Sequence, residues 1–375
     1  MGIEICEVKT NANLKTFVKF PFTLYKNNPF WAPALIADEL NTLRKDKNPA
    51  FEACCARYWL AYDGKRVVGR IAAILNRPHN EKWGQRYLRF GWVDFVDDQE
   101  VSRALLDTVE GWARDEELEA VHGPLGFTNL DHAGMLVEGF NELGTQATIY
   151  NHAYYPEHMK NAGYVKDIDW VEYEILMPEK DDQKIAHLAE ALKKKYGFRI
   201  LTMQDKKDLL PYARELFGLM GNEYSHLYSS VALSEKQVEA YIRQYLNLIP
   251  PEFVPVVLDG DGRMVAFGVT LPSLTRALQK AKGRLLPFGI FHIMQALKKN
   301  DRIDLLLVAV KKEVQGRGVN AILISRMLEV FRKFGIKVAE SNPELETNLA
   351  VQVQWKHFER RQHKRRRSYI KMLAK

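Results

Sequence analysis

The chain has 375 residues, with 54 lysines and arginines against 47 aspartates and glutamates, and a formal net charge of +7. Nine of the basic residues lie between Lys356 and Lys375, so the rest of the chain is close to neutral. This distribution excludes a protein that coats nucleic acid along its whole length. The 46% hydrophobic and 27% charged content is typical of a globular protein and excludes disordered and collagen-like chains.

Length, cysteine content and apolar runs indicate the number of domains, the redox compartment and whether the chain contains a membrane-spanning segment. A chain of this length usually forms about two domains. Three cysteines are an odd number that gives no readable disulfide framework, which favours a reducing compartment. The first residues lack a basic segment followed by an apolar run, so we expect no signal peptide and a cytoplasmic protein. The longest apolar stretch, residues 285–297, is shorter than the roughly 20 residues of a membrane-spanning helix.

The first half of the chain alternates predicted strands and helices. Period-2 alternation indicates strands, apolar spacing of three to four residues indicates helices, and Asp63-Gly64 is a typical hairpin turn. In chain order the pattern predicts a strand (3–10), two helices (11–27, 34–46), a hairpin (56–76), a strand (88–98), a helix (99–118), a strand (120–127), a short helix (154–165) and a strand (169–178).

The second half repeats this order. It predicts a strand (196–204), two helices (205–224, 234–249), a hairpin (253–274), a strand (303–310), a helix (320–335), a strand and loop (336–348), a helix (349–362) and a last strand (365–373). Ser234 and Gln237 have the spacing of a capping box at the start of the second helix. We therefore predict a mixed α/β fold of two tandem domains, 1–180 and 181–375.

One insertion breaks the repeat, at about residues 275–300. Its apolar run is preceded by Arg276, Lys280, Lys282 and Arg284 and followed by Lys298 and Lys299. A segment of this kind can lie in a membrane interface, can cover a pocket for a long acyl chain, or can form an extra core helix. The sequence leaves these three interpretations open.

The clearest chemical signal is a glycine-rich loop between a buried strand and a helix, residues 308–320. Gly316 and Gly318 permit a left-handed turn, and Asn320 is a predicted N-cap of the helix. Backbone N–H groups of such a turn converge with the positive end of the helix dipole. The pattern therefore predicts a site for an anion such as a pyrophosphate.

This loop resembles the acyl-CoA-binding motif of the GNAT acetyltransferase superfamily, Gln/Arg-x-x-Gly-x-Gly/Ala, and the element order of both halves resembles the GNAT fold. Gln315 and Gly318 match the motif, while Asn320 replaces its final small residue. Further on, Asn348 and Val351 match a second family pattern, in which Trp355 stands at the usual tyrosine position. The whole chain resembles bacterial two-domain GNAT-like proteins.

The resemblance implies an acyl-CoA-dependent N-acyltransferase, with acetyl-CoA or another acyl-CoA as co-substrate and no metal. The backbone of Val308 and Val310 would hold the pantetheine arm. The remaining residues implied for the cofactor are Gln315, Gly316, Arg317, Gly318, Val319, Asn320 and Asn348. An amine acceptor needs a base, for which Glu340, Glu344 and Glu346 are candidates and Glu340 is preferred. Tyr369 is a candidate acid, and Tyr224 a candidate wall of the acceptor pocket.

The first half has Asp97 and Asp98 where its own phosphate loop would fall, so we expect it to be a degenerate partner domain that binds no CoA. The basic end of the chain favours an acidic or phosphorylated acceptor, a small molecule or a peptide. It also leaves open RNA binding by an aminoacyl-tRNA-dependent transferase of similar fold. A non-catalytic ligand-binding or scaffold protein is the remaining alternative, and the sequence does not determine the oligomeric state.

Overall fold

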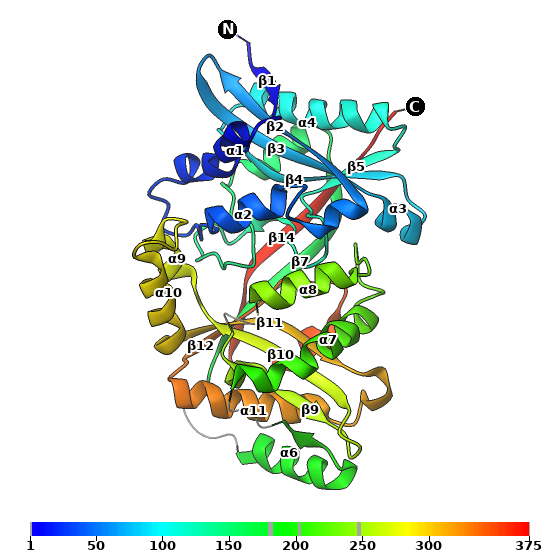
Figure 1. The fold of residues 1–375 in the computed structure, drawn as a ribbon, viewed down its shortest axis with the longest axis vertical. Helices are drawn as coiled ribbons and strands as arrows, with labels where there is room; N and C mark the ends of the chain where they lie inside the picture. Colours follow the sequence, from blue (N-terminus) through cyan, green and yellow to red (C-terminus); the bar gives the residue numbers. More distant parts are fainter. Residues whose placement is uncertain (1, 179–182, 202, 204, 246–248, 375) are drawn as a thin grey trace. The chain divides into compact units, whose positions relative to one another are not determined.

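We describe the protein from a computed structural model that covers residues 2–178, 183–201, 203, 205–245 and 249–374. The chain forms two compact units (Figure 1). Unit 1 consists of Met1–Val171, Thr275–His292 and His363–Lys375, and unit 2 consists of Glu172–Leu274 and Ile293–Gln362. The boundary predicted at residues 180 and 181 lies outside the described residues. The two units cannot be separated at one position in the sequence. The insertion and the last strand predicted for the second domain both contribute to unit 1.

Unit 1 is an α/β unit whose sheet has helices on both faces. Its elements are β1 (Glu4–Glu7), α1 (Asn11–Leu24), α2 (Ile36–Leu43), η1 (Pro49–Glu52), β2 (Cys54–Asp63), β3 (Arg66–Asn76), α3 (Arg77–Trp83), β4 (Tyr87–Phe95), α4 (Gln99–Asp115), β5 (Ala120–Gly123), β6 (Met135–Glu138), α5 (Tyr155–Asn161), α9 (Thr275–Ala281) and parts of β7 (Val165–Leu176), α10 (Gly289–Lys298) and β14 (Arg360–Met372).

Strand β3 shows how the sequence places this unit's core. Ile71 and Ala73 pack toward α4 in one buried cluster, whereas Ala72 and Ile74 pack toward α1 in another. Side chains of a strand alternate between its two faces, so a continuous apolar run is what a strand covered on both sides requires. Leu105 and Val109 of α4 are fully buried in the first cluster, which confirms the predicted helical stripe.

Unit 2 has the same kind of architecture, with α6 and α11 packed together on one side of its sheet. Its elements are α6 (Gln183–Tyr196), β8 (Arg199–Ile200), α7 (Lys206–Glu223), α8 (Glu235–Tyr245), η2 (Pro251–Phe253), β9 (Val256–Leu258), β10 (Met264–Pro272), β11 (Arg302–Val310), η3 (Lys312–Val314), α11 (Val319–Phe334), β12 (Val338–Ser341), β13 (Glu344–Leu345), α12 (Leu349–Gln352) and η4 (Val353–Trp355), with the remaining parts of β7, α10 and β14.

The strand order repeats between the units, and each sheet is completed by a strand from the other half of the sequence. Unit 1 runs β1-β2-β3-β4-β5-β14, and unit 2 runs β8-β9-β10-β11-β12-β7. The fourth and fifth strands are parallel in both, and the sixth is antiparallel to the fifth. The predicted repeat is thus confirmed. The exchange of β7 and β14 could not be foreseen from the element order. Each strand is the last element of its own half of the sequence, and this order would be the same if each strand paired within its own half.

Several local predictions can be compared with the structure. The capping box is present, because Ser234 Oγ accepts from the Gln237 N–H at 3.3 Å and Gln237 Oε1 from the Ser234 N–H at 2.8 Å. The helix predicted over 349–362 is wrong, since only α12 and η4 form before β14 begins at Arg360. Helix α6 was not predicted; it lies directly after the predicted domain boundary, in an interval to which the sequence pattern assigned no element.

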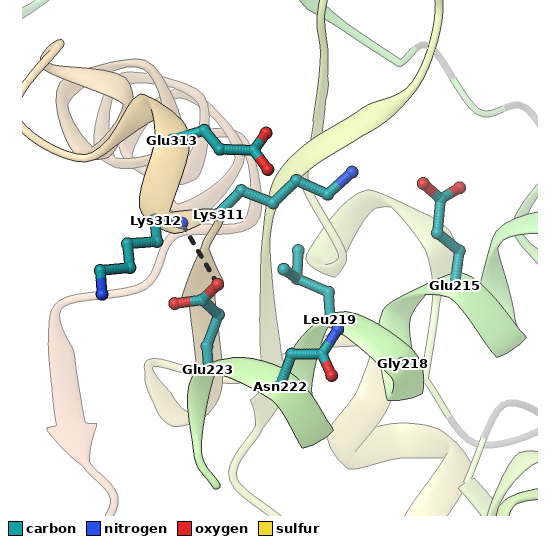
Figure 2. Close-up of a pocket in the computed structure, with 8 residues that line it drawn as sticks. All are labelled: Glu215, Gly218, Leu219, Asn222, Glu223, Lys311, Lys312 and Glu313. Atoms are coloured by element: carbon teal, nitrogen blue, oxygen red, sulfur yellow. Dashed lines mark hydrogen bonds between the residues drawn. The ribbon is translucent and has the colours of Figure 1, made fainter. Parts of the chain in front are cut away.

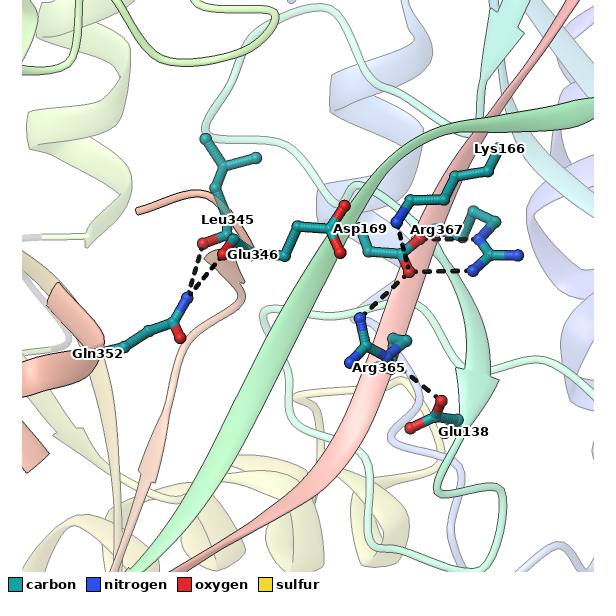
Figure 3. A network of polar contacts seen from close by, with 8 residues as sticks. All are labelled: Glu138, Lys166, Asp169, Leu345, Glu346, Gln352, Arg365 and Arg367. Atoms are coloured by element: carbon teal, nitrogen blue, oxygen red, sulfur yellow. Dashed lines mark hydrogen bonds and ion pairs between the residues drawn. The ribbon is translucent and has the colours of Figure 1, made fainter. Parts of the chain in front are cut away.

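The basic end of the chain is not a solvated tail but the strand β14, in which acidic partners surround the arginines. In unit 1, Arg367 donates to both oxygens of Asp169 at 2.8 and 3.0 Å, Arg365 adds a bond at 3.2 Å and Lys166 an ion pair at 3.3 Å (Figure 3). In unit 2, Arg361 donates to Glu174 at 2.8 Å. Arg361, Arg365 and Arg367 therefore have acidic partners within the protein, and attraction of an acidic acceptor or of RNA by this stretch stays a prediction.

Replacing Asp169 with asparagine should lower the free energy of unfolding by about 2–3 kcal/mol at pH 7, because three cations lose their shared carboxylate. Burial acts to raise the pKa of Asp169, but Arg367 and Lys166 outweigh it and hold that pKa below its ordinary value. The stabilisation is therefore present above about pH 4 and is lost as the pH falls through the lowered pKa. Urea unfolding at pH 7 and pH 3 measures both effects.

Glu138→Gln is the matched control, since Glu138 pairs with Arg365 at 3.3 Å but is 59% exposed. It should cost less than about 1 kcal/mol. Equal losses for the two variants at pH 7, or a difference between them that is as large at pH 3 as at pH 7, would contradict the assignment of this stability to Asp169.

Candidate functional site

The glycine loop of unit 2 has the left-handed backbone that its sequence predicts. Gly316 and Gly318 have φ angles of 77° and 76°, which side chains rarely adopt. Gly318 occupies the N-cap position of α11, and the helix begins at Val319. Asn320 therefore lies inside the first turn, and its prediction as the N-cap is wrong.

The start of α11 presents several unsatisfied donors. Among the described residues, no hydrogen-bond acceptor is found for the backbone N–H groups of Gly316, Gly318, Val319 or Asn320. These groups lie at the positive end of a 16-residue helix, an arrangement that suits an anion. The corresponding helix of unit 1, α4, has its first turn capped instead by Asp98, whose carboxylate accepts from the Glu100 N–H at 2.8 Å.

Glu223 at the end of α7 fixes the entry to the loop. It accepts hydrogen bonds at 3.2 Å from the Lys312 N–H and from the Gln315 side chain, which also donates to the Val310 carbonyl at 2.9 Å. Gln315, which the family motif places in the cofactor site, thus has a structural role here. Glu223 was not predicted, because its position in the sequence is far from the loop.

An open pocket of about 330 Å³ lies between α7 and this entry (Figure 2). Figure 2 shows Lys311 extending over the hollow from the end of β11, with Glu215 on α7 beyond it. Its lining residues are Glu215, Gly218, Leu219, Asn222, Glu223, Lys311, Lys312 and Glu313. Three of them are carboxylates, so a pyrophosphate is better accommodated by the N–H groups at the start of α11 than in this pocket.

The parallel pairing of β11 with β12 covers only the first part of β11. β11 pairs with β12 from Arg302 to Leu305, and Asn342 still contacts this edge through the carbonyls of Leu305 and Leu306, at 3.0 and 3.2 Å. From there to Val310, β11 continues without β12. β12 ends at Ser341, so among the described residues this edge of β11 has no strand partner beyond Leu305.

Tyr224 occupies part of the edge of β11 that lies beyond its pairing with β12. Its hydroxyl donates to the Val308 carbonyl at 2.7 Å and lies 3.3 Å from the Val308 N–H. Burial raises the pKa of Tyr224 to about 12, so the phenol stays protonated at neutral pH. The Val308 groups expected to bind the pantetheine arm are therefore satisfied by a side chain, which a ligand would have to displace.

Beyond Asn342, Glu344 forms a buried pair with Trp355. The indole N–H of Trp355 donates to Glu344 Oε1 at 2.7 Å, and both side chains are 8% exposed. Burial raises the pKa of Glu344 to about 7, although the Trp355 hydrogen bond and the charge of Arg360 act to lower it. The residue that replaces the family's tyrosine thus positions a carboxyl group that changes its charge near neutral pH.

The other predicted site residues lie elsewhere. Glu340 is buried on β12, in register with Asp304 and Glu174 of the neighbouring strands. Tyr369 is 4% exposed within the core of unit 1, where it pairs with Gly123 of β5. Asn348 is the N-cap residue of α12, and its side chain makes no capping hydrogen bond. Arg317 is exposed, with its guanidinium 5.7 Å from the centre of the Tyr196 ring.

Comparisons with known proteins agree with this architecture. No protein-family profile matches the chain. The chain is 26% identical over 370 residues to protein YghO of Escherichia coli K12. This alignment covers 96% of this chain and 93% of that protein. It is also 26% identical over 325 residues to the bacterial ceramide synthase of Caulobacter vibrioides, in an alignment that covers 84% of this chain and 83% of that protein.

Solved structures share the fold at low sequence identity. A tandem GNAT protein from the clavulanic acid biosynthesis pathway superposes with a TM-score of 0.56 at 13% identity, covering 100% of this chain and 99% of that one. The glucosamine N-acetyltransferase region of a fungal multi-domain β-N-acetylglucosaminidase gives a TM-score of 0.57 at 12% identity, covering 98% of this chain and 38% of that one. Among the described residues, no helix is both long and apolar enough to cross a membrane.

Proposed function

From a tandem GNAT-like fold, we propose that this protein transfers the acyl group of an acyl-CoA to an amine, and that unit 2 carries the reaction. The observation that carries the proposal is the start of α11, where the N–H groups of Gly316, Gly318, Val319 and Asn320 have no acceptor among the described residues, beside the part of β11 that extends beyond its pairing with β12. This site would bind the pyrophosphate of CoA. Unit 1, whose α4 is capped by Asp98, would serve as a partner domain.

Glu344 is the proposed general base, in place of the sequence-based preference for Glu340. The amine nitrogen attacks the thioester carbonyl, a C–N bond forms, the C–S bond breaks, and the amine proton passes to the Glu344 carboxylate. The departing CoA thiolate takes up a proton from solvent, and Glu344 releases the amine proton to solvent, which restores the base. Trp355 holds Oε1 of Glu344 by its N–H, so it positions the carboxylate but does not itself exchange a proton. Tyr369 is buried in the core of unit 1, so we assign it no part in the proposed chemistry.

The acceptor is proposed to be a lipid amine. This rests on the ceramide synthase among the relatives, which aligns with 84% of this chain. A ceramide is an amide of a long-chain amino alcohol and a fatty acid, so that protein's name indicates a long acyl donor as well. Acetyl-CoA remains the second donor to test, because the fold neighbours include an N-acetyltransferase.

Calorimetric titration of the full chain with palmitoyl-CoA, below its critical micelle concentration, and with acetyl-CoA tests the donor. We expect saturable binding of at least one of them, with competition by free CoA because the pyrophosphate is the shared group. Product formation with sphinganine, followed by mass spectrometry, then tests the acceptor. Failure of both acyl-CoA species to bind would overturn the acyltransferase proposal. Binding with turnover on other amines alone would overturn only the lipid acceptor.

A further inference from the structure

The insertion ends in an exposed apolar tip on unit 1. The tip consists of residues 285–288, in the turn before α10, and Phe291 in the first turn of that helix. Leu286 is 76% exposed, Phe288 71% and Phe291 65%. Large apolar side chains that are exposed singly are normal, but a cluster within one short segment marks a binding surface.

The base of the tip is firmly attached to unit 1, so the exposure is not that of a loose loop. Thr275 Oγ1 donates to the Gly144 carbonyl at 2.8 Å, and the Gln279 side chain donates to the carbonyls of Pro29 and Trp31, both at 2.9 Å. The Gly283 carbonyl accepts from the Ile36 N–H at 2.9 Å. Helix α9 is thus held at both ends, and residues 285–288 project beyond the last of these contacts.

The charged side chains within the segment that carries the tip are all of one sign. Segment 275–292 contains Arg276, Lys280, Lys282 and Arg284, which are all exposed, and no aspartate or glutamate. Apolar side chains flanked by cations match the interface of a membrane with anionic lipids, where the rings enter the acyl boundary and the cations meet the headgroups. A symmetric contact between two copies would instead bring two cationic surfaces together, which disfavours self-association.

We propose that this tip docks unit 1 onto anionic phospholipid membranes. The surface is a peripheral one, formed by the tip and the four flanking cations, and it is independent of the proposed acyl transfer. For a chain acting on a lipid amine, it would place the protein where such an acceptor resides.

Co-sedimentation of the full chain with vesicles tests the proposal. We expect binding to vesicles of phosphatidylcholine with 30% phosphatidylglycerol at low salt, and markedly weaker binding to phosphatidylcholine alone. The variant Leu286→Ser/Phe288→Ser/Phe291→Ser should lower the partition coefficient by about 100-fold or more, because three large apolar side chains are lost. Val165→Ser/Met372→Ser is the matched control, because these residues are 62% and 60% exposed elsewhere in unit 1; it should bind like the unmodified protein.

A charge-matched pair separates specific docking from general attraction. Lys280→Gln/Lys282→Gln/Arg284→Gln should lose about 10-fold or more in binding to the anionic vesicles, whereas Lys45→Gln/Lys47→Gln/Lys65→Gln should lose little. Thermal unfolding verifies that each variant is folded. No binding by the unmodified chain at low salt would overturn the proposal, as would unchanged binding by the serine triple variant. A concentration-dependent dimer that the serine variant abolishes, without vesicle binding, would assign the tip to a second copy instead.

Discussion

Replacing Glu344 with glutamine is expected to lower kcat for acyl transfer by about 10²–10⁴-fold, the usual contribution of a general base. The amide keeps the shape of the side chain and can still accept from the Trp355 N–H, so folding should be little affected. It cannot take a proton from the amine. Steady-state kinetics with the acyl-CoA that binds in calorimetry provide the measurement.

The pH profile gives a second, independent readout. Burial raises the pKa of Glu344 to about 7, so the active carboxylate form is depleted below that pH and the rate should rise as the pH passes through 7. The glutamine variant should lose this limb of the profile. Glu340→Gln serves as the comparison, because Glu340 was the base preferred from sequence. Loss of activity in Glu340→Gln with a retained rate in Glu344→Gln would reverse the assignment.

Replacing Gly318 with glutamate is expected to weaken acyl-CoA binding by about 100-fold or more. A carboxylate at the start of α11 would repel a pyrophosphate and compete for the same N–H groups. The new Cβ would also lie 2.6 Å from Leu192 Cδ1 of α6, so that helix or its side chain must shift. The dissociation constant for the acyl-CoA, measured by calorimetry, is the quantity to compare.

Gly335→Glu is the matched control at the other end of the same helix. Gly335 has a φ of 73°, close to that of Gly318, and no atom lies within 4 Å of its added Cβ. Both variants place a glutamate in a left-handed backbone conformation, at a conformational cost of about 1–2 kcal/mol. Binding should be retained in Gly335→Glu. Equal loss of binding in both variants would indicate a general effect on α11 and would remove the loop from the site.

Much of the fold was predictable from sequence because local patterns specify it. The apolar run over 303–310 and the glycines that follow it predict β11 and the loop almost to the residue, and the structure places the strand at Arg302–Val310. The signal is strong because a buried strand, a left-handed turn and a helix start each restrict residue choice.

Contacts between residues that are far apart in the sequence could not be predicted. Glu223 and Tyr224 lie more than 80 residues before the loop entry and the strand edge that they bind. The pairing of Glu344 with Trp355 was equally hidden, because nothing in a local pattern reports burial of a carboxyl group. From sequence, Trp355 only stood at the usual tyrosine position of the family pattern, whereas in the structure its N–H donates to a buried carboxylate that becomes the proposed base.

The exchange of β7 and β14 bears on how the molecule is made. Unit 1 needs β14, which pairs with β5 and β6 and is synthesised after every other described element. During translation its sheet therefore waits with the β5 edge unpaired, although domains commonly fold as units in the order of synthesis. Unpaired strand edges invite association with other chains. The nascent protein should accordingly depend on chaperones until β14 has emerged.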